Sequence, residues 1–235
     1  MKYIALPDDS VRRLSFYLAM EEYVARHDDD GDSFFMWQVK PSVIFGRHQV
    51  LHNEVNVDYC HEHGIELYRR KSGGGCVYAD MSNVMFSYIT REGNVNMAFN
   101  RFVGMVLLVL RKMGIEAVGT THNDIMIGDR KVSGTACYHL SGCSIVHSTM
   151  LYDTDMENML RAITPSTEKL QSKGIQSVRQ RITLLKDYTT LSLDAFKSLV
   201  KVTLCDGERQ LTLADVKAIE QLERDYTDIE FIQLH

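Results

Sequence analysis

The feature that constrains the fold most is a series of short apolar segments, rich in β-branched and aromatic residues and separated by turn-forming residues. The series runs from residue 34 to residue 152 and is interrupted once, by a helical pattern at 96–113. Such segments predict strands, and Gly128–Asp129 predicts a two-residue hairpin between two of them. Hairpins together with one crossing helix indicate a mixed or antiparallel sheet with flanking helices, an α/β protein of the α+β type.

Helical patterns flank this strand-rich region. Residues 10–26 predict an amphipathic helix, and the helix at 96–113 is expected to end at Gly114. A short helix is expected at 154–163. From about residue 185 the chain becomes helical again, with Thr212 as the first residue of a capping box.

Length and composition predict an ordinary globular chain. The 235 residues are 45% hydrophobic, which is enough for one sizeable domain, with or without a small appendage. The longest uncharged apolar run, 102–110, is too short to cross a membrane, and the first ten residues do not resemble a signal peptide. We therefore expect a cytoplasmic protein without a membrane partner.

Charge and cysteine usage exclude two further classes of function. The net charge is −5 and no basic tract is present, so nucleic acid is not an expected partner. The five cysteines are scattered and form no C-x-x-C pair, which argues against a disulfide framework or a zinc site.

The segment 69–80, RRKSGGGCVYAD, places three glycines between two expected strands. A simple turn explains one or two glycines, because turns use positive φ angles. A third glycine contributes no packing. It instead favours a backbone concavity that binds an anion, with Arg70 and Lys71 beside it. The residues alone leave both interpretations open.

Lys131 follows the expected hairpin turn. Strict alternation would place Lys131, Ser133 and Thr135 on one face of the strand, with Gly134 and Ala136 on the other. An exposed hairpin lysine is the simpler interpretation. If its face lines a cleft, Lys131 could bind a carbonyl or phosphate oxygen.

Other candidates also allow two interpretations. Asn123–Asp124 is either a turn pair or a source of an oxygen ligand for a divalent cation. His147 is either a half-buried, hydrogen-bonded histidine or part of a pocket. The basic segment 173–181 is either a solvated face or a loop that closes over a phosphorylated ligand.

Three long motifs in a fixed order connect these candidates. Segment 69–80 matches R-R-x-S-G-G-G-A-V-[FY]-x-D, with Cys76 in place of alanine. Segment 123–136 matches N-D-x(n)-G-x-K-[IV]-[SA]-G-x-A, and segment 173–182 matches K-G-I-x-S-V-R-x-R-[IV]. Together they resemble the lipoate–protein ligase A family, whose catalytic domain is shared with biotin–protein ligases. The turn at 45–49, FGRHQ, is similar to the family's G-R-x-Q turn.

This resemblance implies a class II synthetase-like fold. It also implies a catalytic domain at 1–185 and a small helical extension of the same domain at 186–235, without a separate accessory domain. The implied reaction has two steps. Lipoate and ATP, with Mg²⁺, give lipoyl-AMP, and the lipoyl group then passes to one lysine of an apo lipoyl domain. The implied acceptors are E2 subunits of 2-oxoacid dehydrogenases and the glycine cleavage H protein; some short members need a separate accessory protein.

The resemblance also assigns roles to residues. Lys131 is the implied catalytic residue, Asp124 a candidate Mg²⁺ ligand, and His147 a wall of the acyl pocket. The implied adenylate-binding loop carries Lys173, Gly174, Arg179 and Arg181. The remaining implied substrate- and ATP-binding residues are Arg70, Ser72, Gly73, Gly74, Gly75, Cys76, Val77, Tyr78, Asn123, Ser133, Gly134 and Ala136.

Departures from the motifs keep alternatives open. His122 stands where arginine is often found, and Ser148 where glycine is common. A transferase of the same superfamily would move octanoyl or lipoyl groups through a reactive cysteine, for which Cys76 and Cys137 are candidates. A biotin–protein ligase is disfavoured, because the G-R-G-R-x-G-R loop is absent. A non-enzymatic adenylate-binding module that depends on an accessory protein is the third possibility.

Overall fold

The computed structural model describes residues 1–28, 31–121, 124–140, 142–163 and 181–233. Its centre is an eight-stranded mixed sheet in the order β11-β1-β2-β6-β10-β9-β8-β7. Strand β1 pairs in parallel with β2 and β11, and all other pairs are antiparallel. The strands are β1 Lys2–Ala5, β2 Ser33–Trp37, β6 Val84–Thr90, β7 Val118–Gly119, β8 Asp124–Ile127, β9 Arg130–Leu140, β10 Cys143–Met150 and β11 Gly207–Gln210.

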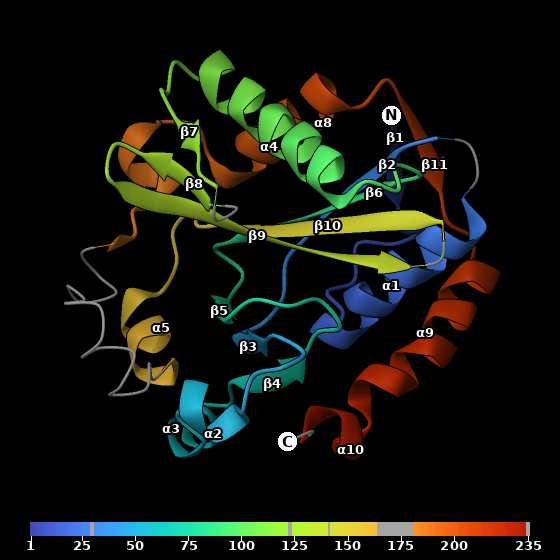
Figure 1. Ribbon diagram of the computed structural model, residues 1–235, viewed down its shortest axis with the longest axis vertical. Coiled ribbons are helices and arrows are strands. Elements are labelled where there is room, and N and C mark those ends of the chain that lie inside the picture. Colours follow the sequence, from blue (N-terminus) through green and yellow to red (C-terminus); the bar gives the residue numbers. More distant parts are fainter. Residues whose placement is uncertain (29–30, 122–123, 141, 164–180, 234–235) are drawn as a thin grey trace.

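Helices cover both faces of this sheet (Figure 1). Helices α4, Val95–Lys112, and α8, Leu193–Leu204, lie on one face. Helix α1, Leu14–His27, lies on the other face, and α9, Leu213–Thr227, packs against α1. Apolar side chains fill both layers, so the central strands β2, β6 and β10 are buried on their two sides.

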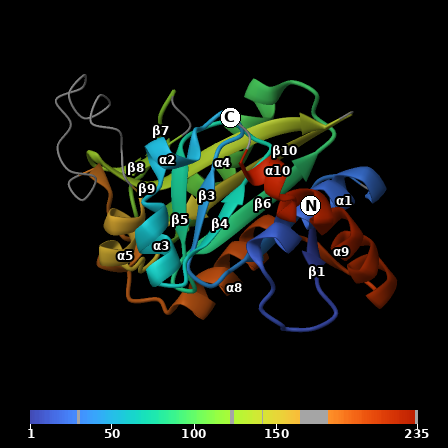
Figure 2. The same ribbon diagram turned by 90° about the horizontal axis from the view of Figure 1, so that it is seen from below.

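A second, three-stranded sheet lies beside the helix α1 layer, in the order β4-β3-β5 (Figures 1 and 2). Its strands are β3 Ser42–Phe45, β4 Glu66–Arg69 and β5 Cys76–Ala79. The third apolar cluster joins it to the short helices around it. These helices are α2 Leu51–Glu54, α3 Val57–Glu62 and α5 Met156–Ala162, while α10 Ile229–Ile232 contacts β4. A 3-10 turn, η1 at Leu185–Tyr188, precedes α8.

The predicted mixed sheet with flanking helices is confirmed, and so are several of its elements. Helix α4 begins after Asn94, whose side chain accepts a hydrogen bond from Met97 N, and Gly114 follows its end with a positive φ of 75°. The hairpin at Gly128–Asp129 joins β8 to β9. Thr212 and Asp215 form the expected capping box of α9.

Helix α1 differs from its prediction. The amphipathic pattern predicted one solvated side, but every residue from Leu14 to Ala25 is buried, including Glu21 and Glu22. The sheet contacts one side of α1 and α9 contacts another. The helix is therefore a central element, and its two glutamates need partners inside the protein.

The outer strands β1, β7 and β11 were not predicted. Strand β11, Gly-Glu-Arg-Gln, carries no β-branched or aromatic residue, and it forms through backbone pairing with β1. The region 186–235 therefore adds a strand to the large sheet as well as helices. The division at residue 185 stays a prediction. No helix in the described ranges has the length and hydropathy needed to span a bilayer.

Candidate active site

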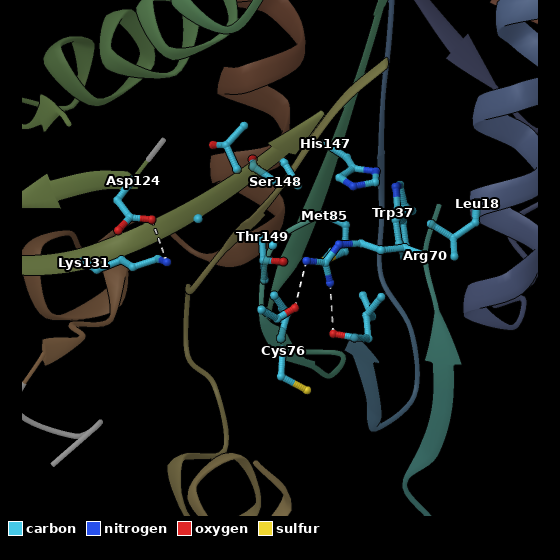
Figure 3. A pocket seen from close by; sticks show the side chains of 17 residues that line it. Leu18, Trp37, Arg70, Cys76, Met85, Asp124, Lys131, His147, Ser148 and Thr149 are labelled. Carbon is cyan, nitrogen blue, oxygen red and sulfur yellow. Dashed lines mark hydrogen bonds and ion pairs between the residues drawn. The ribbon is translucent and has the colours of Figure 1, made fainter. Parts of the chain in front are cut away.

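A cavity of about 340 Å³ lies between the large sheet and the small sheet. Leu18 and Trp37 lie at one end, Asp124 and Lys131 at the other, and Met85 lies between them (Figure 3). A second cavity of about 230 Å³ adjoins it and has mostly apolar walls. Both cavities are lined by Cys76, Val77, Lys131, Gly134 and Thr149. The site therefore has two compartments that meet at Lys131.

A β-bulge decides the direction of Lys131. Ile125 is paired with Ser133, and Met126 is paired with Lys131, so β9 has one residue more than β8 at Val132. An extra residue reverses the alternation of faces. The prediction that Lys131 shares a face with Ser133 was therefore wrong.

Lys131 instead lies over Gly134, within the cavity. A Cβ built on Gly134 would lie 2.7 Å from Lys131 Nζ, so glycine leaves the space that this side chain occupies. Lys131 Nζ forms an ion pair with Asp124 Oδ1 at 2.7 Å. The side chains of Lys131 and Asp124 remain 37% and 29% exposed, so the ammonium group can be reached by a ligand.

Ser133 is not brought to the site. It is fully buried, and its hydroxyl has no hydrogen-bond partner within the described ranges. Its cross-strand neighbour Met150 belongs to the apolar cluster under α4, and directly opposite residues point to the same face. Ala136, in contrast, lines the larger cavity, opposite His147.

Arg70 lines the cavity but is bound mainly to the protein itself. It is 5% exposed, and its guanidinium donates to the carbonyl oxygens of Ile44, Gly73 and Gly75 at 2.7–3.2 Å. Burial lowers the pKa of Arg70 to about 10, which still leaves it charged near neutral pH. These contacts show that Arg70 stabilises the conformation of segment 69–80, which we call the glycine motif.

The three glycines of the motif differ in conformation and position. Gly74 has a φ of +93°, a conformation that favours glycine. A Cβ on Gly73 or Gly75 would meet nothing within 4 Å. Gly74 and Gly75 line the larger cavity. The bare backbone at Gly75 thus faces the cavity, as an anion-binding or ligand-contacting segment requires.

Gly46, in the turn that matches G-R-x-Q, packs against the backbone of the glycine motif. A Cβ on Gly46 would lie 2.1 Å from the carbonyl oxygen of Gly74, so only glycine fits there. Gly46 N donates to Gly75 O, and Arg47 N donates to Ser72 O. The turn and the glycine motif therefore form one backbone unit.

Ser72 and His147 are brought together in the protein interior. Ser72 is 1% exposed and its Oγ lies 2.7 Å from His147 Nε2. His147 Nδ1 lies 3.0 Å from Glu21 Oε2, and the ring lines the larger cavity. Ser87 Oγ donates to Glu21 and accepts from Trp37 Nε1. Ser72 does not line either cavity, so the structure places it behind His147.

Sequence reasoning missed the glutamates that complete these contacts. Glu21 and Glu22 lie in the middle of the apolar run of α1, and that position was the available signal: two adjacent acids in an apolar helix need buried partners. Arg69 was also missed. It is 1% exposed and donates to the carbonyl oxygens of Gly46, Arg47, Gln49 and Ile232.

The candidate cysteines have no sign of activation. Burial raises the pKa of Cys76 to about 12, and Arg70 lowers it by less. Burial also raises the pKa of Cys137 to about 12. A nucleophilic cysteine needs a lowered pKa. Both thiols are therefore poor thioester formers in this state.

Val77 and Tyr78 extend the site along β5. Val77 lines both cavities, and Tyr78 lines the smaller one. Tyr78 is 1% exposed, and its pKa is raised, chiefly by burial. The smaller cavity is completed by Glu54, Leu151, Met159, Ile163 and Ile182.

Several predicted residues lie outside the described residues: Asn123, Lys173, Gly174 and Arg179, as does the departure at His122. Arg181 is described and exposed. Its neighbour Ile182 forms a bridge with Lys131 and lines the smaller cavity. The end of the basic segment therefore reaches the site, while the role of the segment stays a prediction.

The residues in the cavity offer little to a metal ion by themselves. The described part of the chain holds no group of three His, Cys, Asp or Glu side chains suited to a metal. Asp124 could contribute one carboxylate oxygen, and Mg²⁺ commonly takes one or two carboxylates together with substrate phosphates. Because Asp124 is paired with Lys131, such binding would require their ion pair to open.

Comparison with known proteins identifies the family. The family model for the lipoyl protein ligase A/B catalytic domain matches residues 14–204. The chain belongs to this family. It is 34% identical to lipoate–protein ligase 1 of Staphylococcus aureus over 96% of this chain and 70% of that protein. It is 36% identical to the lipoate–protein ligase LplJ of Bacillus subtilis over 88% of this chain and 66% of that protein.

A solved structure agrees over the whole chain. A bi-partite lipoate protein ligase from Thermoplasma acidophilum, studied with its E2 lipoyl domain, is 26% identical. The match covers 100% of this chain and 98% of that one, with a TM-score of 0.86. The chain spans between half and 70% of the length of the curated relatives that it matches. The family and the fold predicted from the sequence are thereby confirmed.

Proposed function

We propose that this chain is the catalytic part of a lipoate–protein ligase. It would activate lipoate with ATP to lipoyl-AMP and transfer the lipoyl group to a lysine of an apo lipoyl domain. The observation that carries the proposal is the position of Lys131, at the junction of an apolar-ended compartment, which Gly74 and Gly75 also line, and a second, smaller compartment. A reaction that joins an acyl group to a nucleotide needs a cation where the two substrates meet.

The larger compartment suits the acyl substrate. Leu18, Trp37 and Met85 give this compartment an apolar surface away from Lys131, which favours a hydrocarbon or dithiolane group. His147 faces the same space, but both of its ring nitrogens are engaged within the protein. The carboxylate of such a substrate would then point toward Lys131.

The smaller compartment suits the adenylate, and Gly75, which lines the larger compartment, directly precedes Cys76, which lines both. Lys131 would attract both the acyl carboxylate and the α-phosphate, which brings the attacking oxygen close to phosphorus and stabilises the negative charge of the transition state. Mg²⁺, when bound through Asp124 and the phosphates, would neutralise charge on the leaving pyrophosphate. A crystal structure of a lipoate–protein ligase A bound with ATP, 25% identical with a TM-score of 0.85, supports a nucleotide as the second substrate.

The acceptors that we propose are the lipoyl domains of E2 subunits and the glycine cleavage H protein. The relative studied with its E2 lipoyl domain supports the first of these. That relative is called bi-partite, and longer relatives extend beyond the match, so an accessory protein or domain is part of the proposal. We also propose a cytoplasmic location, where the five cysteines would remain reduced.

The proposal is tested by incubating the protein with lipoate and an apo lipoyl domain, with and without ATP and magnesium. We expect a mass increase on one acceptor lysine that requires ATP, and pyrophosphate release in the same mixture. Transfer from an octanoyl carrier protein without ATP, lost in Cys76→Ser or Cys137→Ser, would instead establish the transferase reaction. The raised pKa of both thiols argues against that outcome.

A further inference from the structure

The glycine motif is attached to α1 by two neighbouring glutamates that touch neither cavity. Glu21 is 0% and Glu22 is 1% exposed. Neither residue lines the two compartments of the site. A buried carboxylate is costly unless it is paired, so the partners of these glutamates are strongly held.

Glu21 reaches the motif through His147. Its carboxylate accepts from His147 Nδ1 at 3.0–3.1 Å and from Ser87 Oγ at 2.6 Å. With Nδ1–H donating to Glu21, a neutral imidazole has its acceptor at Nε2, and Ser72 Oγ is 2.7 Å from that atom. Glu21 therefore fixes the tautomer of His147, and His147 in turn holds Ser72.

Glu22 reaches the motif directly. Its Oε1 accepts from Lys71 Nζ at 2.5 Å and from Tyr226 Oη at 2.7 Å, while Arg26 lies 3.3 Å from Oε2. Lys71 Nζ also lies 4.6 Å from the centre of the Tyr226 ring. Two successive residues of the motif, Lys71 and Ser72, are thus held by two successive residues of α1.

The glycines that follow have no side chains to restrain them and are held by backbone contacts alone: Arg70 donates to Gly73 O and Gly75 O, and Gly46 N donates to Gly75 O. Gly73 and Gly75 carry no side chain, and the space around their missing Cβ atoms is open for 4 Å. Glycine loses more conformational freedom on ordering than any other residue, so a free loop would populate many conformations. The fixed positions of Lys71 and Ser72 limit that freedom.

We propose that Glu21 and Glu22 are positioning residues, which hold the glycine motif in the conformation that receives the nucleotide. The identity of this ligand rests on the proposed function, whereas the attachment of the motif to α1 does not. If only a fraction of the molecules has the motif in this conformation, the apparent dissociation constant for ATP rises by the inverse of that fraction. The bound state has the motif in place, so turnover changes little.

The experiment compares Glu22→Gln and Glu21→Gln with Glu220→Gln, an exposed residue of α9. Each glutamine keeps the shape and an acceptor oxygen but loses the charge. We expect the dissociation constant for ATP to rise about tenfold in the first two variants, with kcat changed less than about twofold. Amides 70–76 should exchange with deuterium about ten times faster without ligand, whereas amides of the central strands β6 and β10 should change only in line with any fall in the denaturant midpoint of global unfolding.

The other end of each contact provides an independent check. Lys71→Met should repeat the effect of Glu22→Gln and add nothing to it in the double variant, and Ser72→Ala should do the same with Glu21→Gln. If a glutamate variant does not fold, Lys71→Met and Ser72→Ala test the same contacts in its place. Wild-type exchange at 70–76 and an unchanged ATP affinity in all four variants would overturn the inference. A wild-type protein that does not acylate its acceptor with ATP would contradict the proposed function alone, because the exchange experiment uses no ligand.

Discussion

The two sides of the cavity use polar residues in opposite ways. On the β8–β9 side, Lys131 and Asp124 are part-exposed and have each other as partners. On the glycine-motif side, Arg70, Ser72 and His147 are at most 7% exposed and hydrogen-bonded to the protein. The difference teaches that charge near a site is not equivalent to reactivity. A group that acts on a ligand must be able to give up its partner within the protein and bind the ligand instead. A group that holds the shape of the site must keep its partner.

Loss of Lys131 should have the largest effect on activity. In Lys131→Ala we expect kcat/KM for acylation of the acceptor to fall by about two to three orders of magnitude, because the cation between the two compartments is removed. The free energy of unfolding should change by less than about 0.5 kcal/mol, since the side chain is part-exposed. The measurement is the mass shift of the acceptor over time, together with urea denaturation. Turnover close to wild type would remove Lys131 from the reaction.

Loss of Arg70 should act mainly on stability, in contrast to Lys131. Arg70→Met leaves the carbonyl oxygens of Ile44, Gly73 and Gly75 without their donor in a buried position. We expect a loss of about 3 kcal/mol in the free energy of unfolding, from urea denaturation. Arg70→Lys, with fewer donors and no planar fork, should be intermediate. An unchanged denaturation midpoint in Arg70→Met would show that these contacts do not hold the motif.

A glycine-to-alanine substitution can be made on each side of the cavity, at Gly46 beside the glycine motif and at Gly134 beside Lys131. In Gly46→Ala the new Cβ meets the backbone oxygen of Gly74 at 2.1 Å, so the backbone must move, and we expect about 2 kcal/mol of destabilisation. In Gly134→Ala the new Cβ meets the end of Lys131, which can swing away. Activity should then fall about tenfold through misplacement of the cation, with little change in stability. The reverse pattern, with a stable Gly46→Ala and an unfolded Gly134→Ala, would contradict the comparison.

The smallest effect is expected at Cys76. Cys76→Ala should retain ATP-dependent activity within about threefold, because the thiol acts as a small packing group. In the wild-type protein, raising the pKa of this thiol from 9.0 to about 12 makes its thiolate fraction at pH 8 about a thousandfold smaller. Alkylation by iodoacetamide should be correspondingly slow at pH 8 and should rise with pH up to about 12. Fast alkylation at pH 8, with loss of transfer, would favour the transferase reaction.

Local patterns were sufficient for much of the fold. The hairpin at Gly128–Asp129, the helix that ends before Gly114 and the capping box at Thr212 depend on neighbours within a few residues, and all three are present. Strand β11 could not be predicted in this way, because a polar edge strand is stabilised by backbone pairing with β1, about 205 residues away along the chain.

The sequence by itself determined the family, the order of the motifs and the placement of glycines where the backbone must be bare. Only the tertiary structure decided which face Lys131 occupies, because one extra residue at Val132 reverses the alternation. It also decided that Ser72 is held by the protein, since its partner His147 is 75 residues away and His147 in turn meets Glu21, 126 residues away. Local spacing predicts which residues are near a site; the partners that each side chain meets in the folded chain determine whether it binds, reacts or supports.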